Sequence, residues 1–159
     1  MATRHRAAGT VGRRRLIGLA AAGAGLLALG WPRGEARADQ AEAKALLDKL
    51  TRNGQAKAGK VTLQLPEIAE NGNTVPLTVS VESPMTDVDR VKTITVVAEA
   101  NPSPLVTQIS LGPAAGKAEV QLRIRLAATQ HVTAVAEMSD GSLWTDTQEV
   151  KVTIGGCGG

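Results

Sequence analysis

The sequence predicts a mainly β protein, an immunoglobulin-like antiparallel β-sandwich with one N-terminal helix and a flexible C-terminal arm rich in glycine. Beyond residue 60, apolar residues recur at every second position in short runs, as they do in half-buried strands. Clusters of Gly, Pro, Asn and Asp separate these runs, which is the pattern of a sandwich of immunoglobulin size. We therefore expect residues 55–154 to form one sandwich domain in which each sheet has one solvated face.

Residues 1–38 are interpreted as a signal peptide. Residues 13–15 are three consecutive arginines, and the apolar run at 19–29 is too short and too rich in Ala and Gly to span a membrane comfortably. Ala-Arg-Ala at 36–38 has the small-x-small pattern that signal peptidase reads. Consecutive arginines before a weakly hydrophobic run favour the twin-arginine route to the periplasm, with the general secretory route as the alternative.

Removal of this leader would change the net charge of the protein. Residues 1–38 hold seven arginines and one acid, a net charge of +6, whereas the other residues hold 11 bases and 14 acids, a net charge of −3. After the leader, Trp144 is the sole aromatic residue, and no second long apolar segment follows. Nucleic-acid binding needs basic patches or aromatic faces, so we expect no nucleic-acid partner. Because no second long apolar segment is present, we also expect no membrane association once the leader is removed.

The residues directly after the leader predict one helix, at 39–54. Asp39 is suited to cap its N-terminus, and Asn53-Gly54 is a stop signal. We expect the apolar face of this helix to lie against the sandwich domain or a partner. That face comprises Ala41, Ala45, Leu46, Leu47 and Leu50.

Seven or eight short strands are expected after the helix. The run at 120–126 is the most regular, with apolar residues on one side and polar or charged residues on the other. Turn clusters lie at 70–73, 83–84, 101–104, 112–113 and 139–141. The other strands are expected at 61–65, 75–81, 94–98, 105–111, 132–136, 143–145 and 150–154.

The last predicted strand leads into an arm formed by Gly155, Gly156, Cys157, Gly158 and Gly159. Glycine has no Cβ, so we expect the arm to be mobile, and five extended residues reach roughly 17 Å. The thiol is the only side chain of the arm, so a narrow channel in another protein could admit the backbone and meet only sulfur. Ordering the arm costs about 1–2 kcal/mol per residue, which suits a carrier that must leave each partner after each step.

Cys157 is the single cysteine of the chain, so it cannot form an internal disulfide. No His or Lys lies close to it in sequence to activate the thiol, and no second cysteine can resolve an adduct. We therefore interpret Cys157 as a passive handle that carries substrate covalently. The protein is accordingly interpreted as a carrier subunit and not as an enzyme, and no catalytic residue is assigned.

Two alternatives remain open from the residues. An exported sandwich could dimerise through a disulfide between two copies of Cys157. A ubiquitin-like carrier would be loaded at Gly159 as a thiocarboxylate, but that chemistry needs ATP-dependent activation in the cytosol, and the export signal argues against it.

Other residues with chemical potential indicate no further site. His131 has no second His and no nearby Cys in the chain after the leader, which disfavours metal or catalytic use. Asp87, Asp89 and Asp140 fall at turns and lack the further oxygen ligands of a calcium loop. Trp144 is expected in the core or at an interface. We therefore expect neither a bound metal nor a cofactor.

The C-terminal sequence VKVTIGGCGG at 150–159 resembles that of the SoxY family, the sulfur-carrier subunits of the periplasmic thiosulfate-oxidising (Sox) system. The consecutive arginines of the leader, the segment IAENGNTVP at 68–76 and the strand-rich middle agree with this resemblance. The resemblance implies an immunoglobulin-like sandwich without a cofactor, which carries sulfur intermediates on Cys157 and forms a heterodimer with a SoxZ-like subunit.

The same resemblance implies three transient partners. A c-type cytochrome would join thiosulfate oxidatively to Cys157, and a manganese-dependent hydrolase would then release sulfate. A sulfane dehydrogenase with molybdenum and haem would oxidise the remaining sulfur where that enzyme is present.

Overall fold

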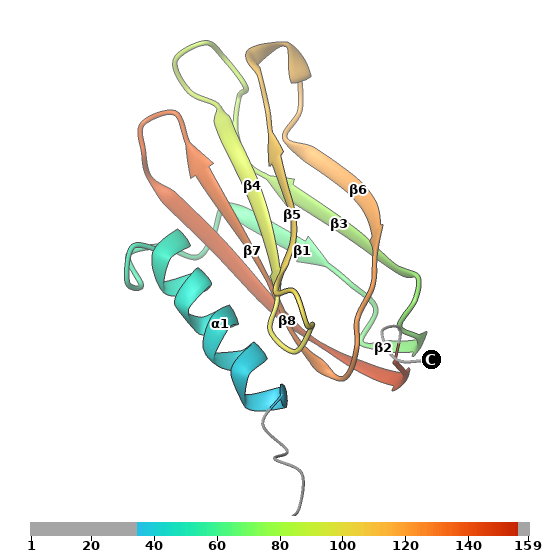
Figure 1. Ribbon diagram of the computed structural model, residues 1–159. Helices are drawn as coiled ribbons and strands as arrows, with labels where there is room; N and C mark the ends of the chain where they lie inside the picture. The colour runs from blue at the N-terminus through green and yellow to red at the C-terminus, as the bar shows by residue number, and fades with distance from the viewer. Residues whose placement is uncertain (1–34, 156–159) are drawn as a thin grey trace, which may run out of the picture. The chain divides into compact units, whose positions relative to one another are not determined.

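A computed structural model describes the backbone of residues 35–155 and the side chains of residues 40–155. This part of the chain is mainly β with one α-helix, as predicted (Figure 1). In chain order the elements are α1 (Glu35–Leu50), β1 (Val61–Gln64), β2 (Ile68–Asn71), β3 (Val75–Val81), β4 (Val91–Ala98), β5 (Leu105–Ser110), the 3-10 helix η2 (Pro113–Ala115), β6 (Glu119–Ile124), β7 (Gln130–Met138) and β8 (Leu143–Ile154).

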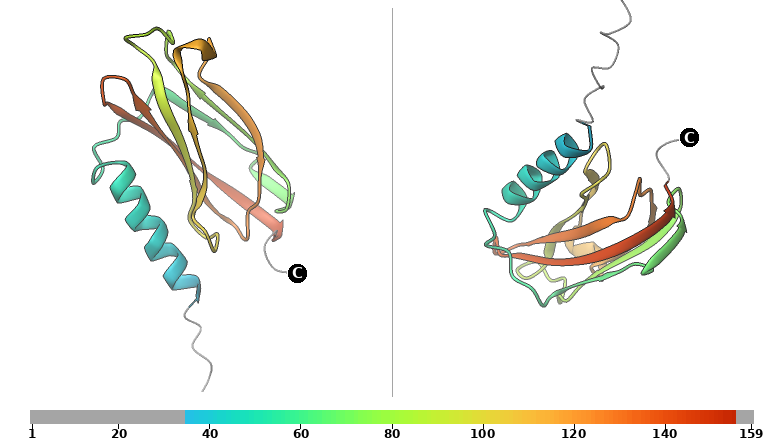
Figure 2. Two further views of the ribbon diagram at one scale, coloured as in Figure 1. Left: turned by 45° about the horizontal axis from the view of Figure 1, so that its top comes forward. Right: turned by 90° about the horizontal axis from the view of Figure 1, so that it is seen from below.

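The strands form two sheets that pack face to face, so the predicted β-sandwich is confirmed (Figures 1 and 2). One sheet has three strands in the order β1-β3-β6, and the other has five in the order β2-β8-β7-β4-β5. Neighbouring strands are antiparallel except β2 and β8, which are parallel. The expectation of a purely antiparallel sandwich is therefore wrong at one edge. The immunoglobulin-like classification stays a prediction.

Strand β2 includes residues that were expected to form a turn. Glu70 and Asn71 belong to a strand because the segment pairs with the end of β8, with Ile68 opposite Lys151 and Asn71 opposite Ile154. The turn begins only at residue 72. Turn-forming residue types thus lie in strand here because a neighbouring strand offers hydrogen-bond partners to their backbone.

The hydrophobic core lies between the two sheets and is built from aliphatic side chains. Its largest fully buried members include Leu77 of β3, Ile94 of β4 and Leu126, which follows β6. Both sheets contribute residues at alternate positions, as the period of two predicted. Trp144 is only partly buried and packs at the margin of this core, so its expected packing role is confirmed.

The outer face of the five-stranded sheet is covered, and the expectation of one solvated face for each sheet is wrong here. Thr95 and Val97 of β4 and Thr133 and Val135 of β7 point away from the core between the sheets, yet all four are buried. Helix α1 lies over this face (Figure 2) and buries Ala43 against it. The central strands β4 and β7 are therefore buried on both faces along much of their length, which explains why consecutive residues are apolar at 96–98 and at 134–136.

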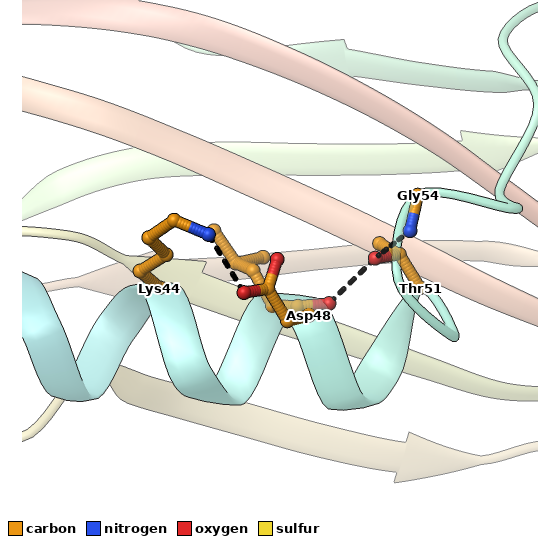
Figure 3. A network of polar contacts seen from close by, with 5 residues as sticks. Lys44, Asp48, Thr51 and Gly54 are labelled. Carbon is orange, nitrogen blue, oxygen red and sulfur yellow. Dashed lines mark hydrogen bonds and ion pairs between the residues drawn. The ribbon is translucent and has the colours of Figure 1, made fainter.

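Helix α1 begins earlier than predicted and ends near the predicted stop signal. It starts at Glu35, so Asp39 lies inside the helix of the full chain and not at its N-cap. After Leu50 the backbone turns through residues with positive φ, Arg52, Asn53 and Gly54. Figure 3 shows the local contacts: the Thr51 hydroxyl donates to the Leu47 carbonyl at 2.7 Å and accepts from the Gly54 amide at 3.2 Å. Removal of the leader before Asp39 stays a prediction.

Strand β8 is one continuous strand of 12 residues and not the two pieces that were expected. It pairs with β7 from Leu143 to Val150, including the polar stretch between the two apolar segments. Two side chains of that stretch link β8 to the backbone of β1 and of the residue directly after it. Asp146 accepts from the Leu63 amide at 2.8 Å, and Gln148 accepts from the Leu65 amide at 3.1 Å. Among the described residues, no helix is long and apolar enough to cross a membrane.

Candidate carrier site at the end of strand β8

The predicted carrier arm begins where β8 ends. Gly155 is the one arm residue within the described part of the chain, and Gly156, Cys157, Gly158 and Gly159 lie outside it. The mobility of the arm and the role of Cys157 therefore stay predictions. What the structure describes is the base from which the arm leaves the sandwich.

The last residues of β8 are bonded on both sides. The Val152 amide donates to the Thr129 hydroxyl at 3.0 Å, and the Lys151 amide donates to the Glu67 carbonyl at 2.9 Å. At the final residue, the Gly72 amide donates to the Ile154 carbonyl at 2.7 Å. Hydrogen bonds to neighbouring backbone and side-chain groups therefore hold β8 in place up to its last residue.

Gly155 passes very close to the loop between β6 and β7. A Cβ placed on Gly155 would come closer to the carbonyl oxygen of Ala127 than real Cβ atoms essentially ever come to another atom. The φ of Gly155 is not in the left-handed region, so glycine is needed here for space and not for conformation. From the sequence alone, Gly155 was expected to make the arm mobile. Nothing in the local sequence indicated that Ala127 comes close to it.

Two buried amides organise the loop that carries Ala127. Asn101 Nδ2 donates to the Arg125 carbonyl at 2.8 Å, and its Oδ1 accepts from the Ala127 amide at 2.9 Å. Gln130 Nε2 donates to Asn101 Oδ1 at 2.9 Å and to the Ala128 carbonyl at 3.1 Å. Asn101 lies in a predicted turn cluster and Gln130 precedes a predicted strand, so no local pattern indicated that either residue lies beside the arm.

The other residues weighed in the sequence do not converge on a site. His131 Nδ1 lies 3.7 Å from Glu99 Oε2 at the surface, and Asp87 and Asp89 are exposed. Trp144 Nε1 donates to the Ser142 hydroxyl at 3.1 Å, and the Lys60 ammonium lies 5.1 Å from its ring centroid. Within residues 40–155, no group of three or more His, Cys, Asp or Glu side chains is placed to hold a metal ion.

Asp140 is the described residue whose pKa clearly departs from its ordinary value. Hydrogen bonds from the side chain and then the backbone of Ser142 lower the pKa of its carboxyl. The Ser142 amide donates to Asp140 Oδ1 at 2.8 Å, which closes the turn between β7 and β8. This geometry is that of a structural turn acid, as the sequence indicated.

The fold and the site define a class of protein: a small β-sandwich whose last strand leads into a segment with a single cysteine among glycines. The chain belongs to the SoxY family, because the family model described as "Sulfur oxidation protein SoxY" matches residues 46–157. That match covers more than half of the chain and extends to the sole cysteine. Membership of this family, together with the solved SoxY structure described next, supports a sulfur-carrier role.

Solved structures agree with this assignment. The chain is 30% identical to the sulfur carrier protein SoxY from Chlorobium limicola f thiosulfatophilum, with 73% of this chain and 99% of that chain covered and a TM-score of 0.57. It also resembles a superoxide reductase (neelaredoxin) from Ignicoccus hospitalis, with 18% identity, 59% of this chain and 80% of that chain covered, and a TM-score of 0.53. The second likeness shows the fold alone. No curated protein sequence showed significant similarity to the chain.

Proposed function

We propose that the protein carries sulfur intermediates covalently on Cys157 during thiosulfate oxidation and presents them to partner enzymes. The observation that carries this proposal is the SoxY family match, which includes Cys157, the sole thiol of the chain. The glycines on both sides of Cys157 support it, because they leave sulfur as the only side chain of the terminal segment.

The proposed cycle needs a loading step and a release step. In loading, the Cys157 thiolate and the sulfane sulfur of thiosulfate form an S–S bond, and two electrons pass to a c-type cytochrome. In release, a manganese-dependent hydrolase adds water to the terminal sulfonate. Sulfate leaves with two protons, and a persulfide remains on Cys157 for a sulfane dehydrogenase. In this cycle the protein is a substrate of each partner and not itself the catalyst.

Its location and stable partner are part of the same proposal. The twin-arginine leader would export the protein to the periplasm, and a SoxZ-like subunit would form the heterodimer with it. The leader supports this pairing because the twin-arginine route exports folded proteins, so a single leader serves two subunits. Co-purification from the periplasmic fraction, with the mass of the intact complex, tests both statements.

Mass analysis of the native protein tests covalent carriage. We expect the intact protein to gain the mass of a thiosulfonate or a sulfane adduct on Cys157, and reductant should remove it. A doubled mass without any adduct would support a Cys157-linked homodimer. A modification confined to Gly159 would support thiocarboxylate chemistry. Either result would contradict the proposal.

The variant Cys157→Ser tests whether the thiol is needed, because it replaces the sulfur atom by oxygen and changes little else. The variant should fold with an unchanged Tm, because residue 157 lies beyond the last strand, and thiosulfate oxidation by the reconstituted system should be abolished. The control is Ser110→Ala at the exposed end of β5, which should retain activity. Continued thiosulfate oxidation by Cys157→Ser would show that the carrier assignment is wrong.

A further inference from the structure

We infer that Asn101 and Gln130 are positioning residues for the carrier segment. They hold the Ala127 carbonyl against Gly155 and so fix the point at which the chain leaves the sandwich. The claim that these residues hold the Ala127 carbonyl against Gly155 depends on described residues alone. The claim that this contact helps to present Cys157 to partner enzymes rests on the proposed function.

The first step is that these two side-chain amides are buried and that the nitrogen and the oxygen of each are hydrogen-bonded. Asn101 is 7% exposed and Gln130 is 5% exposed, and burial of an amide is costly unless it is hydrogen-bonded. Asn101 bonds to the backbone on both sides of Leu126, at Arg125 and at Ala127. Gln130 bonds to Asn101 and to Ala128, and its Oε1 accepts from the Ala100 amide at 2.7 Å. Together they determine the path of the loop between β6 and β7.

The second step is that the same loop is bonded to the end of β8. The Leu126 amide donates to the Gly72 carbonyl at 2.8 Å, and the Gly72 amide donates to the Ile154 carbonyl at 2.7 Å. Gly72 therefore connects the loop to the last residue of β8. The side chain of Leu126 is fully buried in the core, so the loop cannot shift without disturbing the core.

The third step is the contact at Gly155. Because the Ala127 carbonyl occupies the place of a side chain on residue 155, the loop and the start of the arm fit together only with glycine at this position. Gly155 is then a fixed residue at the base of the arm. Two peptide units separate it from Cys157, so covalent geometry keeps the two Cα atoms within about 7 Å of each other.

The first experiment compares two glycines whose surroundings differ. Gly155→Ala should lower the Tm by about 5 °C, because its Cβ meets the Ala127 carbonyl, whereas Gly112→Ala should leave the Tm within about 1 °C, because no atom lies close to the Cβ that it adds. In an Asn101→Ala background the carbonyl is no longer held, so the additional loss from Gly155→Ala should be smaller than in the native background. Equal Tm values for the two alanine variants, or fully additive losses, would overturn the inference.

The second experiment measures two things separately: the local stability of the base of the arm, and the rate at which Cys157 is loaded by a partner enzyme. In Asn101→Ala, amide hydrogen exchange should become faster at Gly72, Leu126 and Val152 and should stay unchanged at Leu63, which is held by Asp146. Alkylation of Cys157 by iodoacetamide should proceed at the native rate, because the thiol itself is untouched. For loading of Cys157 with thiosulfate by the cytochrome partner, kcat/KM should fall about tenfold, because the start of the arm is no longer held in one orientation.

These readouts separate the inference from the proposed function. If the native protein is never loaded with thiosulfate, the proposed function fails, while the Tm and exchange results still decide the geometry. If Asn101→Ala is loaded at the native rate, the positioning role is wrong although carriage stands. Gln130→Ala serves as a second variant if Asn101→Ala does not fold, and the same outcomes apply to it.

Discussion

Single residues at the turn between β7 and β8 show how one polar contact affects stability. Gly141 adopts a φ of 81°, and its amide donates to the Met138 carbonyl at 3.0 Å. Asp140 precedes it and accepts the Ser142 amide, which lowers the pKa of the Asp140 carboxyl. A carboxyl whose pKa is lower in the folded state than in the unfolded state stabilises the fold above its unfolded pKa. That contribution is lost as the pH falls through the folded pKa.

The change Asp140→Asn tests this dependence on pH. At neutral pH the variant should have a lower Tm than the native protein, because the charged acceptor is gone. The difference in Tm should begin to shrink as the pH falls below about 4, the ordinary pKa of an Asp carboxyl, and should vanish once the pH is below the lowered pKa of the folded carboxyl. Calorimetry across this pH range measures it, with Asp87→Asn at an exposed bend as the control. A difference that stays constant down to the lowest pH would contradict the assigned cause.

Helix α1 and the five-stranded sheet show at the scale of elements why periodicity alone was incomplete. The outward residues of β4 and β7 are buried because the helix covers them, and Leu50 lies beside Thr95 and Val135 at this contact. In β5 the expected apolar face is also interrupted. A register shift in the pairing with β4 leaves Leu105 43% exposed, while Val106 packs on the core. Such an irregularity depends on the neighbouring strand and is not visible in β5 itself.

The contact between helix and sheet can be tested with two alanines of α1. Ala43 is 1% exposed, so Ala43→Leu would force extra atoms into a packed contact and should cost about 1–3 kcal/mol of unfolding free energy. Ala45 is exposed on the same helix, and Ala45→Leu should change the unfolding free energy by at most about 0.5 kcal/mol. Urea denaturation measures both. Equal effects would show that the helix does not pack on the sheet in solution.

The whole molecule depends on one core shared by two sheets and built without aromatic side chains. Strands from distant parts of the sequence contribute to it, and Trp144 packs only at its margin. Small aliphatic side chains fill this space closely, so the loss of a single large one should leave a cavity that the surroundings cannot fill.

Leu77 of β3 tests the shared core. It is 2% exposed, and Leu77→Ala should lower the unfolding free energy by about 2–5 kcal/mol through lost burial and a residual cavity. Val88 is 85% exposed, so Val88→Ala should change it by at most about 0.5 kcal/mol. Chemical denaturation measures both changes, with the curves fitted to a common m value. A small loss for Leu77→Ala would mean that the two sheets do not share a packed core.

The class of fold, the position of most strands and the end of the helix could all be predicted from the amino-acid sequence. These features follow from local patterns: a period of two in each strand, and glycine and asparagine where the backbone turns. The sequence also singled out Cys157, since a sole cysteine among four glycines is visible without a structure.

Which distant parts of the chain become neighbours could not be predicted and is known from the folded structure. The fold makes β2 a parallel partner of β8, covers the outer face of β4 and β7 with α1, and brings the Ala127 carbonyl against Gly155. Asn101 and Gln130 act at the base of the arm from positions far from it in sequence. The physical reason is that a local pattern reports the two faces of its own segment, whereas the group that meets each face comes from elsewhere in the chain.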